Sequence, residues 1–407
     1  MNIKPCVIGL GYVGLPVLIN LSKKFKTFGF DINKKRVIDL SRGLDSTKEF
    51  KKKELSLINK KNLTHSIKDI RECNIFIVCV PTPINIKKKP DLSPLISACK
   101  MLSKILKKKD IIIFESTVYP GTTKDVCIPL LEKYSRLKLK KKEFSVCYSP
   151  ERVNPGDRKH SLNKINKIIA VPNNEILSIV KKVYNNLSKK LIISKNIEEA
   201  ETSKVIENIQ RDLNISLMNE VYIFCEELNI NFDNVYKLAS TKWNFGKYRP
   251  GLVGGHCLPV DPYYFSYIAN KHNIKTSVTL AGRGINEYMR RYIIKKIKIN
   301  LRKNSFNFKK DNIYFAGLTY KKNVSDLRNS QAFKIFSYFR NYNNRVFGID
   351  PYIDKNLKIG IADLNYIKKK NIGCVIVLVK HDEFNNLSNK LKKNIKILSF
   401  FDLKINF

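Results

Sequence analysis

The 407-residue sequence predicts an α/β protein in which two parallel-sheet domains flank a central helical segment. In residues 1–195, short β-branched runs alternate with helical apolar periods, a pattern typical of parallel sheets. One long helical period then covers residues 197–228, and a second strand–helix alternation begins at Asn312. A chain of this length usually forms two or three domains, and we expect them over 1–195, 196–304 and 305–407.

Apolar spacing places the individual elements. Strands of the first domain are expected at Pro5–Ile8, Thr27–Phe30, Ile75–Val80, Ile111–Glu115 and Phe144–Tyr148. Helices between them include Leu15–Lys24 and Leu95–Leu106. The central segment is expected to hold a helix over Ile197–Leu228, a turn-rich stretch, and a helix from about Leu280 to Leu301. After a linker at Lys303–Asp311, the last domain is expected to contain Ile313–Ala316, a helix at Gln331–Tyr342, Arg345–Ile349 and Cys374–Val379.

The net charge of +41, from 76 basic and 35 acidic residues, is the strongest compositional signal. The lysines lie in short runs throughout the chain, for example Lys107–Lys109 and Lys140–Lys142, where solvated loops and helix faces are expected. No aromatic RNA-binding motif accompanies them, so no specific nucleic-acid partner is expected. Coding bias of an AT-rich genome is our hypothesis for the excess, although a positive field would attract anionic nucleotides.

The nine cysteines and five histidines indicate neither a disulfide framework nor a metal site. The cysteines are scattered and include no CxxC pair, which favours reduced thiols in a cytoplasmic protein. No apolar run approaches the ~20 residues that cross a bilayer, so no membrane insertion is expected. Glycines and Pro16 interrupt the apolar amino-terminal stretch, which favours a buried strand over a signal peptide.

A glycine motif, Gly9-Leu10-Gly11-Tyr12-Val13-Gly14, follows the first expected strand and opens a helix. Glycines at this spacing allow a tight turn, close approach of a pyrophosphate, and helix–strand packing. Asp31 ends the second expected strand and is suited to bind the ribose hydroxyls of NAD. The pattern therefore predicts a Rossmann-like NAD-binding domain, with Lys35 and Arg36 leaving some tolerance for NADP open.

A second motif, Gly254-Gly255-His256-Cys257-Leu258-Pro259-Val260-Asp261-Pro262, sets a thiol in a stiff, glycine-rich turn. Such a thiol is placed like a nucleophile, although most cysteines are small buried hydrophobic residues. Beside a nicotinamide cofactor, a nucleophilic cysteine suggests aldehyde oxidation through a thiohemiacetal and a thioester. That chemistry also needs an oxyanion stabiliser and a base or activated water.

Several residues are candidates for these further roles. Lys204 and Asn208 share one face of the long helix and could hold an alkoxide, unless Lys204 is a solvated surface lysine. Asp261 could act on the thiol or on water, or could cap the turn. Glu151 and Thr117 follow strand ends, where open α/β sheets bind ligands, although Glu151 could instead be a surface ion-pair partner.

The chain resembles the UDP-glucose/GDP-mannose dehydrogenase family, which oxidises C6 of a nucleotide sugar with two NAD. The resemblance covers nearly the whole length and rests on ordered motifs: GLGYVGLP from Gly9, VPTP from Val80, ESTVYPGTT from Glu115, SPERVNPGD from Ser149, KVIENIQRDLNISLMNE from Lys204, TKWNF from Thr241, RPGLVGGHC from Arg249, VDPYY from Val260, AGRGIN from Ala281 and GLTYKKNVSDLRNS from Gly317. The TKWNF and RPGLVGGHC forms are most similar to the UDP-N-acetylhexosamine 6-dehydrogenases of the Vi-antigen and O-antigen type.

This resemblance implies a role for each candidate residue. Cys257 would be the nucleophile, Lys204 and Asn208 would stabilise the oxyanion, and Asp261, Glu151 and Thr117 would handle protons and the hydrolytic water. Implied cofactor contacts are Gly9, Gly11, Tyr12, Val13, Gly14, Asp31, Arg36, Thr82, Thr117, Glu151 and Arg328. Implied substrate contacts are Glu151, Arg152, Lys204, Asn208, Arg249, Gly251, Val253, Gly254 and Lys321. The resemblance also implies that the central helix mediates a homodimer and that the last domain binds UDP.

Three departures from the family pattern remove no reactive group. Leu258-Pro259 stands where this branch usually has isoleucine-glycine, Thr319-Tyr320-Lys321 replaces alanine-phenylalanine-lysine, and Asn286-Glu287 replaces asparagine-aspartate. We therefore expect an active enzyme of polysaccharide biosynthesis, with UDP-N-acetylglucosamine ahead of UDP-N-acetylgalactosamine, UDP-N-acetylmannosamine and UDP-glucose as the substrate. An inactive nucleotide-sugar-binding protein is the alternative from another class.

Overall fold

A computed structural model describes residues 2–153, 157, 161–185, 187–303, 306–307, 310–353, 372–384 and 396–399. The chain divides into two compact units. Unit 1 comprises Met1–Glu207 and Tyr263–Lys275, and unit 2 comprises Asn208–Pro262 and Thr276–Phe407.

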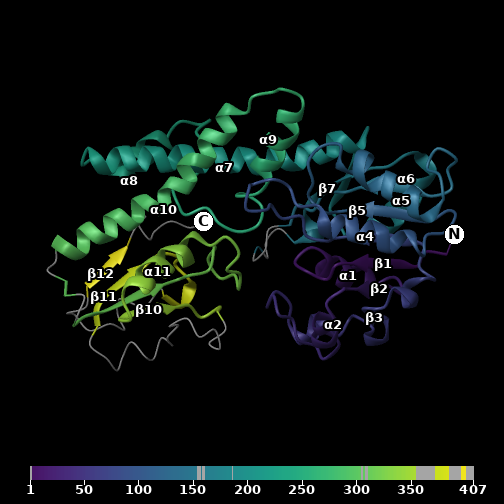
Figure 1. Ribbon diagram of the computed structural model, residues 1–407, viewed down its shortest axis with the longest axis horizontal. Helices are drawn as coiled ribbons and strands as arrows, with labels where there is room; N and C mark the ends of the chain where they lie inside the picture. The colour runs from purple at the N-terminus through teal and green to yellow at the C-terminus, as the bar shows by residue number, and fades with distance from the viewer. Residues whose placement is uncertain are drawn as a thin grey trace. The chain divides into compact units, whose positions relative to one another are not determined.

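Unit 1 is built on an eight-stranded sheet, coloured from purple to teal in Figure 1. Its strands are β1 (Pro5–Ile8), β2 (Phe28–Phe30), β3 (Leu63–Thr64), β4 (Ile75–Val78), β5 (Ile111–Phe114), β6 (Ser145–Tyr148), β7 (Asn166–Ala170) and β8 (Lys190–Ser194), in the order β3-β2-β1-β4-β5-β6-β7-β8. The neighbours pair in parallel except β6 and β7, which are antiparallel. The five predicted strands are confirmed, whereas β3, β7 and β8 were not predicted.

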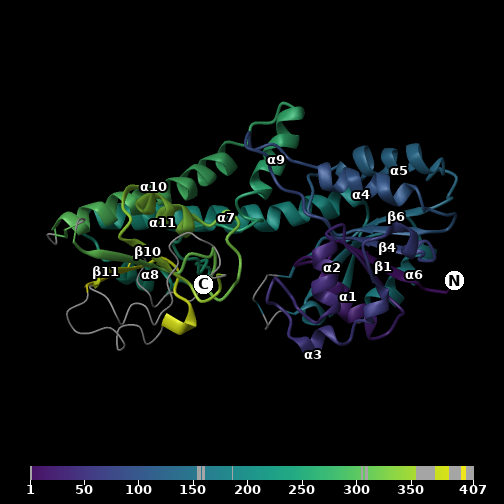
Figure 2. The same cartoon turned by 60° about the horizontal axis from the view of Figure 1, so that its bottom comes forward.

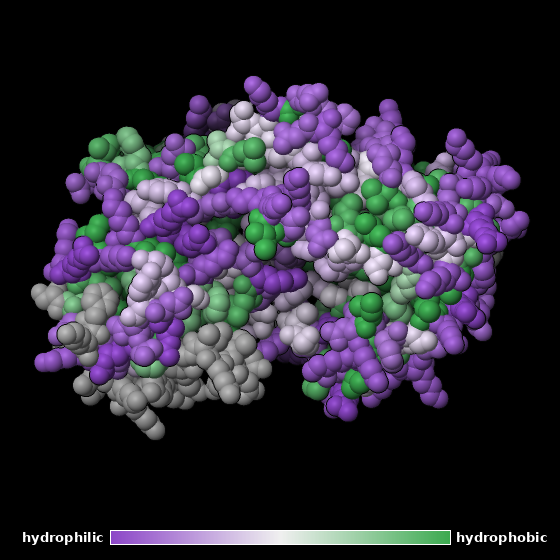
Figure 3. Space-filling view, viewed as in Figure 1, coloured by the Kyte–Doolittle hydropathy of each residue, from purple (hydrophilic) through white to green (hydrophobic). Residues whose placement is uncertain are grey.

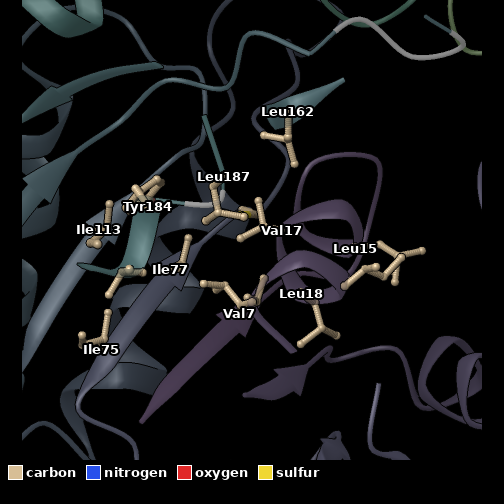
Figure 4. Packing of buried hydrophobic residues seen from close by; sticks show 14 of the residues in the cluster. Val7, Leu15, Val17, Leu18, Ile75, Ile77, Ile113, Leu162, Tyr184 and Leu187 are labelled. Atoms are coloured by element: carbon tan, nitrogen blue, oxygen red, sulfur yellow. The ribbon is translucent and has the colours of Figure 1, made fainter. Parts of the chain in front are cut away.

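Helices cover both faces of this sheet. Strand side chains alternate between two cores, because successive residues of a strand point to opposite faces. Figure 4 shows the first core, where Val7, Ile75, Ile77 and Ile113 from the strands meet Leu18 of α1 and Tyr184 of α6. The covering helices of that face are α1 (Gly14–Ser22), α2 (Lys34–Ser41) and α6 (Asn174–Tyr184). The other face packs against α4 (Ser93–Ser103) and α5 (Ile128–Ser135), visible above β4 and β6 in Figure 2.

Short helical turns complete this unit. They are α3 (Lys52–Leu55), the 3-10 turns η1 (Lys60–Asn62), η2 (Ile67–Ile70) and η4 (Leu162–Lys164), and the π-helical turn η3 (Thr123–Cys127).

The central segment is helical as predicted, but with two helices more than expected. The long helix α7 (Ile197–Glu227) leaves unit 1 after Glu207 and continues in unit 2. α10 (Ser277–Lys303) is the second predicted helix. The stretch predicted to be rich in turns also contains α8 (Phe232–Ala239) and α9 (Asp261–Lys271). Among the described helices, none combines the length and the hydropathy needed to span a membrane.

Unit 2 contains a four-stranded parallel sheet in the order β10-β9-β11-β12. Its strands are β9 (Asn312–Ala316), β10 (Val346–Ile349), β11 (Ile372–Val377) and β12 (Lys396–Ser399), and its helices include α11 (Gln331–Tyr342) and the turn η5 (Asp382–Phe384). Ile313 and Phe315 pack with Ile335 of α11 and Ile297 of α10 in one core. The predicted strand Cys374–Val379 ends two residues earlier than expected, and part of the predicted linker lies outside the described residues.

Candidate active site

The glycine loop after β1 is shaped by steric limits at two glycines and by open space at a third. Gly9 has φ +89°, and a Cβ on Gly14 would lie 1.9 Å from the Gly9 carbonyl oxygen. A Cβ on Gly11 would meet nothing within 4 Å. Val13 precedes α1 and provides no side-chain cap for the amides of its first turn. An open approach to uncapped helix amides fits the pyrophosphate of a dinucleotide.

Asp31 is fixed at the end of β2 by the same loop. Its Oδ2 accepts a hydrogen bond from Leu10 N at 2.8 Å, and its Oδ1 accepts one from Asn33 N at 2.8 Å. The carboxylate is thus held beside the glycine loop, as binding of a ribose diol requires.

The two basic residues after Asp31 are already paired. Lys35 bonds Asp39 at 2.5 Å, and Arg36 Nη1 bonds Asp45 at 2.8 Å while its Nε donates to Leu10 O. Both cations are therefore neutralised by carboxylates rather than held for a 2′-phosphate, which favours NAD over NADP. Arg36 Nη2 is buried and bonds no described residue, so one donor beside the loop is left for the cofactor.

Thr82 and Thr117 are brought together by the loops that follow β4 and β5. Thr82 Oγ1 donates to Thr117 O at 2.5 Å, and the Tyr264 hydroxyl donates to Thr82 O. Glu201 of α7 secures the Thr117 loop by accepting from Gly121 N at 2.6 Å and Thr123 N at 2.9 Å. Burial outweighs these two hydrogen bonds and raises the pKa of Glu201 to about 7.

Glu151 lies in the loop after β6 and is buried, so the alternative of a surface ion pair is wrong. Its Oε1 accepts from Arg152 N at 2.7 Å and Val153 N at 2.6 Å, and its Oε2 accepts from Lys167 Nζ at 2.9 Å. Burial disfavours the charged form, but the Lys167 ammonium and these amides more than offset it and lower the pKa of Glu151. Arg152 bonds Asn166 O at 3.0 Å and Glu207 at 2.9 Å.

Lys204 and Asn208 lie one turn apart on α7, and both are buried. The alternative of a solvated Lys204 is therefore wrong. Asn208 Nδ2 donates to Asp261 Oδ2 at 2.5 Å, and Asn208 Oδ1 accepts from Arg211 Nη2 at 2.9 Å. The orientation of the amide is thus fixed, and its second N–H is the group that could serve an oxyanion.

The predicted cysteine turn is held in unit 2 by backbone contacts. Gly255 has φ +86°, its N donates to Arg328 O at 3.1 Å, and its O accepts from Asn329 Nδ2 at 2.9 Å. Cys257 O accepts from Val260 N and Asp261 N, both at 2.9 Å, where α9 begins. Cys257 is partly exposed, whereas the other eight cysteines are buried. The interpretation as a small buried hydrophobic residue therefore fits those eight and not Cys257.

The predicted substrate contacts preceding this turn make bonds within unit 2. Arg249 bonds Asp233 at 2.6 Å and lies 3.6 Å over the Tyr236 ring. Asn219 of α7 binds both polar groups of Gly251, donating to its O at 3.1 Å and accepting from its N at 2.7 Å. Asn219 thus fixes the backbone of Gly251 in unit 2.

The other predicted contacts of unit 2 differ in exposure and packing. Val253 is buried, Lys321 is half-buried, and a Cβ on Gly254 would lie 2.9 Å from Tyr320 Cβ. Arg328 bonds the Asp326 carboxylate through Nε and Nη2. Their contacts with cofactor or substrate stay predictions.

The chain matches known proteins along nearly its whole length. Residues 1–188 match the NAD binding domain of the UDP-glucose/GDP-mannose dehydrogenase family, residues 198–288 its central domain, and residues 315–406 its UDP binding domain. The chain belongs to the UDP-glucose/GDP-mannose dehydrogenase family.

Two relatives in this family are the UDP-N-acetyl-D-glucosamine 6-dehydrogenases of Pseudomonas aeruginosa and Salmonella typhi. They are 40% and 38% identical to the chain over 99% and 96% of its length, which is 97% and 92% of theirs. A solved UDP-D-ManNAc dehydrogenase from Pyrococcus horikoshii has a TM-score of 0.86 at 29% identity, covering 99% of this chain and 96% of that one.

Membership in the UDP-glucose/GDP-mannose dehydrogenase family confirms the predicted fold class, enzyme class and cofactor. The chain is an NAD-dependent oxidoreductase with a UDP-binding domain at its carboxyl-terminal end. Bound NAD accepts hydride. The residues that fit it are the glycine loop with its open approach at Gly11, the fixed Asp31 and the spare donor of Arg36.

Sequence reasoning missed two polar residues, one in each unit, that hold predicted site residues in place. Lys167 bonds Glu151 from β7, and Asn219 clamps Gly251 from α7. Lys167 is one of many lysines, and only its place directly before the apolar run Ile168–Ala170 marks it. Asn219 follows Asn208 by 11 residues, three helical turns, so helical periodicity could have placed both on one face.

Proposed function

We propose that this protein oxidises C6 of a UDP-N-acetylhexosamine, with UDP-N-acetylglucosamine as the first candidate, to the uronic acid at the cost of two NAD. The two relatives named above act on UDP-N-acetyl-D-glucosamine by their names, and this supports that sugar over UDP-glucose. The carrying observation is that Cys257 is the one partly exposed cysteine, in a turn whose Asp261 bonds Asn208.

The proposed reaction has two oxidations and one hydrolysis. The first removes a hydride and a proton from the C6 alcohol and gives an aldehyde. The Cys257 thiolate adds to this carbonyl, and Lys204 with the second N–H of Asn208 holds the resulting alkoxide. The second oxidation removes another hydride and leaves a thioester on Cys257.

Hydrolysis completes the proposed sequence. One water adds to the thioester carbon, the C–S bond breaks, and the thiol, the carboxylate product and one proton result. Glu151, Thr117 and Asp261 are proposed to position this water and move its protons. Because the Lys167 ammonium keeps Glu151 ionised, this carboxylate serves as a hydrogen-bond acceptor for the water.

We further propose that the enzyme is a cytoplasmic homodimer that serves polysaccharide biosynthesis. UDP is assigned to the last domain with Lys321, and the segment Arg249–Gly254 is assigned to the sugar nucleotide. Support for a dimer comes from α7, where Leu217 and Phe224 are 53% and 58% exposed. Such an apolar stripe is expected to be covered by a second copy.

The test is the NADH yield from limiting UDP-N-acetylglucosamine, UDP-N-acetylgalactosamine, UDP-N-acetylmannosamine and UDP-glucose, each with excess NAD. Two NADH for each UDP-N-acetylglucosamine, with the highest kcat/KM of the four, is the expected result. Exclusive turnover of UDP-glucose would refute the substrate assignment. Stoichiometric binding of these sugars with no NADH from any would instead support an inactive binding protein.

A further inference from the structure

A buried lysine links two carboxylates at one edge of the unit 1 sheet. Lys167 Nζ lies 2.9 Å from Glu151 Oε2 and 3.1 Å from Glu115 Oε2. The Lys167 side chain is 2% exposed, and those of Glu115 and Glu151 are 0% and 7% exposed. Buried charges are retained only where partners compensate them, so the three side chains form one interdependent group.

The antiparallel strand β7 explains why these residues meet. Glu115 and Glu151 come soon after the carboxyl ends of β5 and β6, which run in parallel. β7 runs in the opposite direction to β6, so Lys167, near the start of β7, lies at the same edge. A parallel β7 would have placed this lysine at the other end of the sheet.

Tyr184 and Glu115 form further contacts with the lysine and with each other. The Tyr184 hydroxyl donates to Glu115 Oε1, and its ring centroid lies 5.7 Å from Lys167 Nζ. Burial raises the pKa of Glu115, whereas the pKa of Glu151 is lowered because Lys167 and two backbone amides offset its burial. The pKa values of the two carboxyl groups are thereby shifted in opposite directions, and Glu151 is the one kept ionised.

We propose that Lys167 is a positioning residue for thioester hydrolysis, which it serves by holding the Glu151 carboxylate ionised and fixed in orientation. This proposal rests on the role assigned to Glu151 above. Lys167 acts only through Glu151, and Glu115 with Tyr184 fixes Lys167 in turn. Without the ammonium, a buried carboxylate would take up a proton, and the neutral group would be a weaker hydrogen-bond acceptor that could no longer take a proton from water.

The decisive variants are Lys167→Met and Glu115→Gln, studied by rapid-mixing and steady-state kinetics between pH 5.5 and 9. For Lys167→Met we expect the first hydride transfer and the KM for the UDP-sugar to stay within about 2-fold of wild type. We expect kcat at pH 7 to fall at least about 10-fold, a cost typical of a misplaced general base. Activity that needs ionised Glu151 is lost as pH falls through the pKa of this group. Because removal of the ammonium raises that pKa, the acid limb of the pH–rate profile should move to higher pH.

Glu115→Gln changes the charge beside Glu151 in the opposite direction, because it removes a negative group instead of a positive one. It removes a carboxylate that disfavours ionisation of Glu151, so the acid limb should not move to higher pH. A merely structural role of the lysine would lower stability in both variants without this difference in pH profile. Lys167→Arg keeps the charge and is expected to restore the acid limb toward wild type.

Exposed Lys164 lies three residues before Lys167, and Lys164→Met is the matched control, with wild-type kinetics expected. NAD binding and thermal melting report folding, and if Lys167→Met does not fold, Lys167→Gln replaces it with the same expected shift of the acid limb. A wild-type pH profile and kcat in the folded variant that lacks the ammonium, alongside an impaired Glu151→Gln, would overturn this inference alone. Wild-type turnover of Glu151→Gln would instead remove the proposed role on which it rests.

Discussion

Glu201 is a single buried carboxyl group that makes the stability of the fold depend on pH. It lies on α7 one turn before Lys204, and its two oxygens accept the amides of Gly121 and Thr123 in the Thr117 loop. Its pKa is raised from 4.5 to about 7 because burial disfavours its charge. The folded protein therefore holds a proton between these pH values that the unfolded chain has lost.

We expect this group to make folding less favourable as pH rises. Below pH 4.5 this carboxyl group is protonated in both the folded and the unfolded state. As pH rises from 4.5, the group ionises first in the unfolded chain, which lowers the free energy of unfolding. By the folded pKa of about 7 the stabilisation lost amounts to roughly 3 kcal/mol. Glu201→Gln cannot ionise, and its stability relative to wild type should increase from pH 4.5 to 8. Melting temperatures of both proteins across this range test the expectation, and parallel curves would contradict it.

Asn208 provides a second single-residue test. Removing one oxyanion donor typically costs about 100- to 1,000-fold in kcat, so Asn208→Ala is expected to lose activity in this range while the KM for NAD is retained. Asn214→Ala is the matched control, because this amide on the same helix bonds only Gln210 O among the described residues. Equal kcat values for the two variants would remove Asn208 from the oxyanion site.

In the turn from β1 into α1, Gly11 and Gly14 are required for different physical reasons. Gly14 is needed because a Cβ would collide with Gly9 O, which fixes the packing of α1 on its strand. Gly11 meets no protein atom, so only a ligand would require its small size. Fold and cofactor binding can therefore be separated by two substitutions three residues apart.

Gly11→Ala is expected to keep the wild-type melting temperature and to raise the KM for NAD at least about 10-fold, since the methyl group would occupy the pyrophosphate approach. Gly14→Ala is expected to destabilise unit 1 by about 1–3 kcal/mol through overpacking. Thermal melting and NAD titration measure both effects. A Gly11→Ala variant with unchanged NAD affinity would exclude this loop as the pyrophosphate site.

Local sequence patterns predict some elements of the fold but not others. β1, the glycine loop and α7 follow from short-range spacing, and all three are found where expected. β7 carries the polar pair Asn166-Lys167 and runs antiparallel, and no local signal gives a strand its direction. The bonds of Lys167 and Asn219 depend on that tertiary arrangement, so their roles could not be derived from spacing alone.

The surface of the described residues combines many solvated polar side chains with scattered exposed apolar ones. Figure 3 shows hydrophilic side chains spread over the visible face, as scattered lysines would produce. Against this background Leu217 and Phe224 are exposed on α7, seven residues or two helical turns apart. Apolar residues repeated along one helix face favour association of two copies.

We therefore expect Leu217→Glu with Phe224→Glu to convert the proposed dimer into a monomer. The mass in solution from light scattering is the measurement. Tyr342→Glu on α11 is the control, because it places the same charge at an exposed aromatic position of another helix. A wild-type protein that is monomeric at micromolar concentration would contradict the proposed interface.

The covalent role of Cys257 is tested most directly by the turnover of Cys257→Ser with UDP-N-acetylglucosamine and NAD. The thiol is partly exposed and the substitution is close to isosteric, so the variant should fold and bind both ligands. We expect its rate of uronic acid formation to fall by at least about 1,000-fold, because a hydroxyl is a far weaker nucleophile than a thiolate at neutral pH. Formation of the acid at the wild-type rate would show that the reaction does not pass through this cysteine.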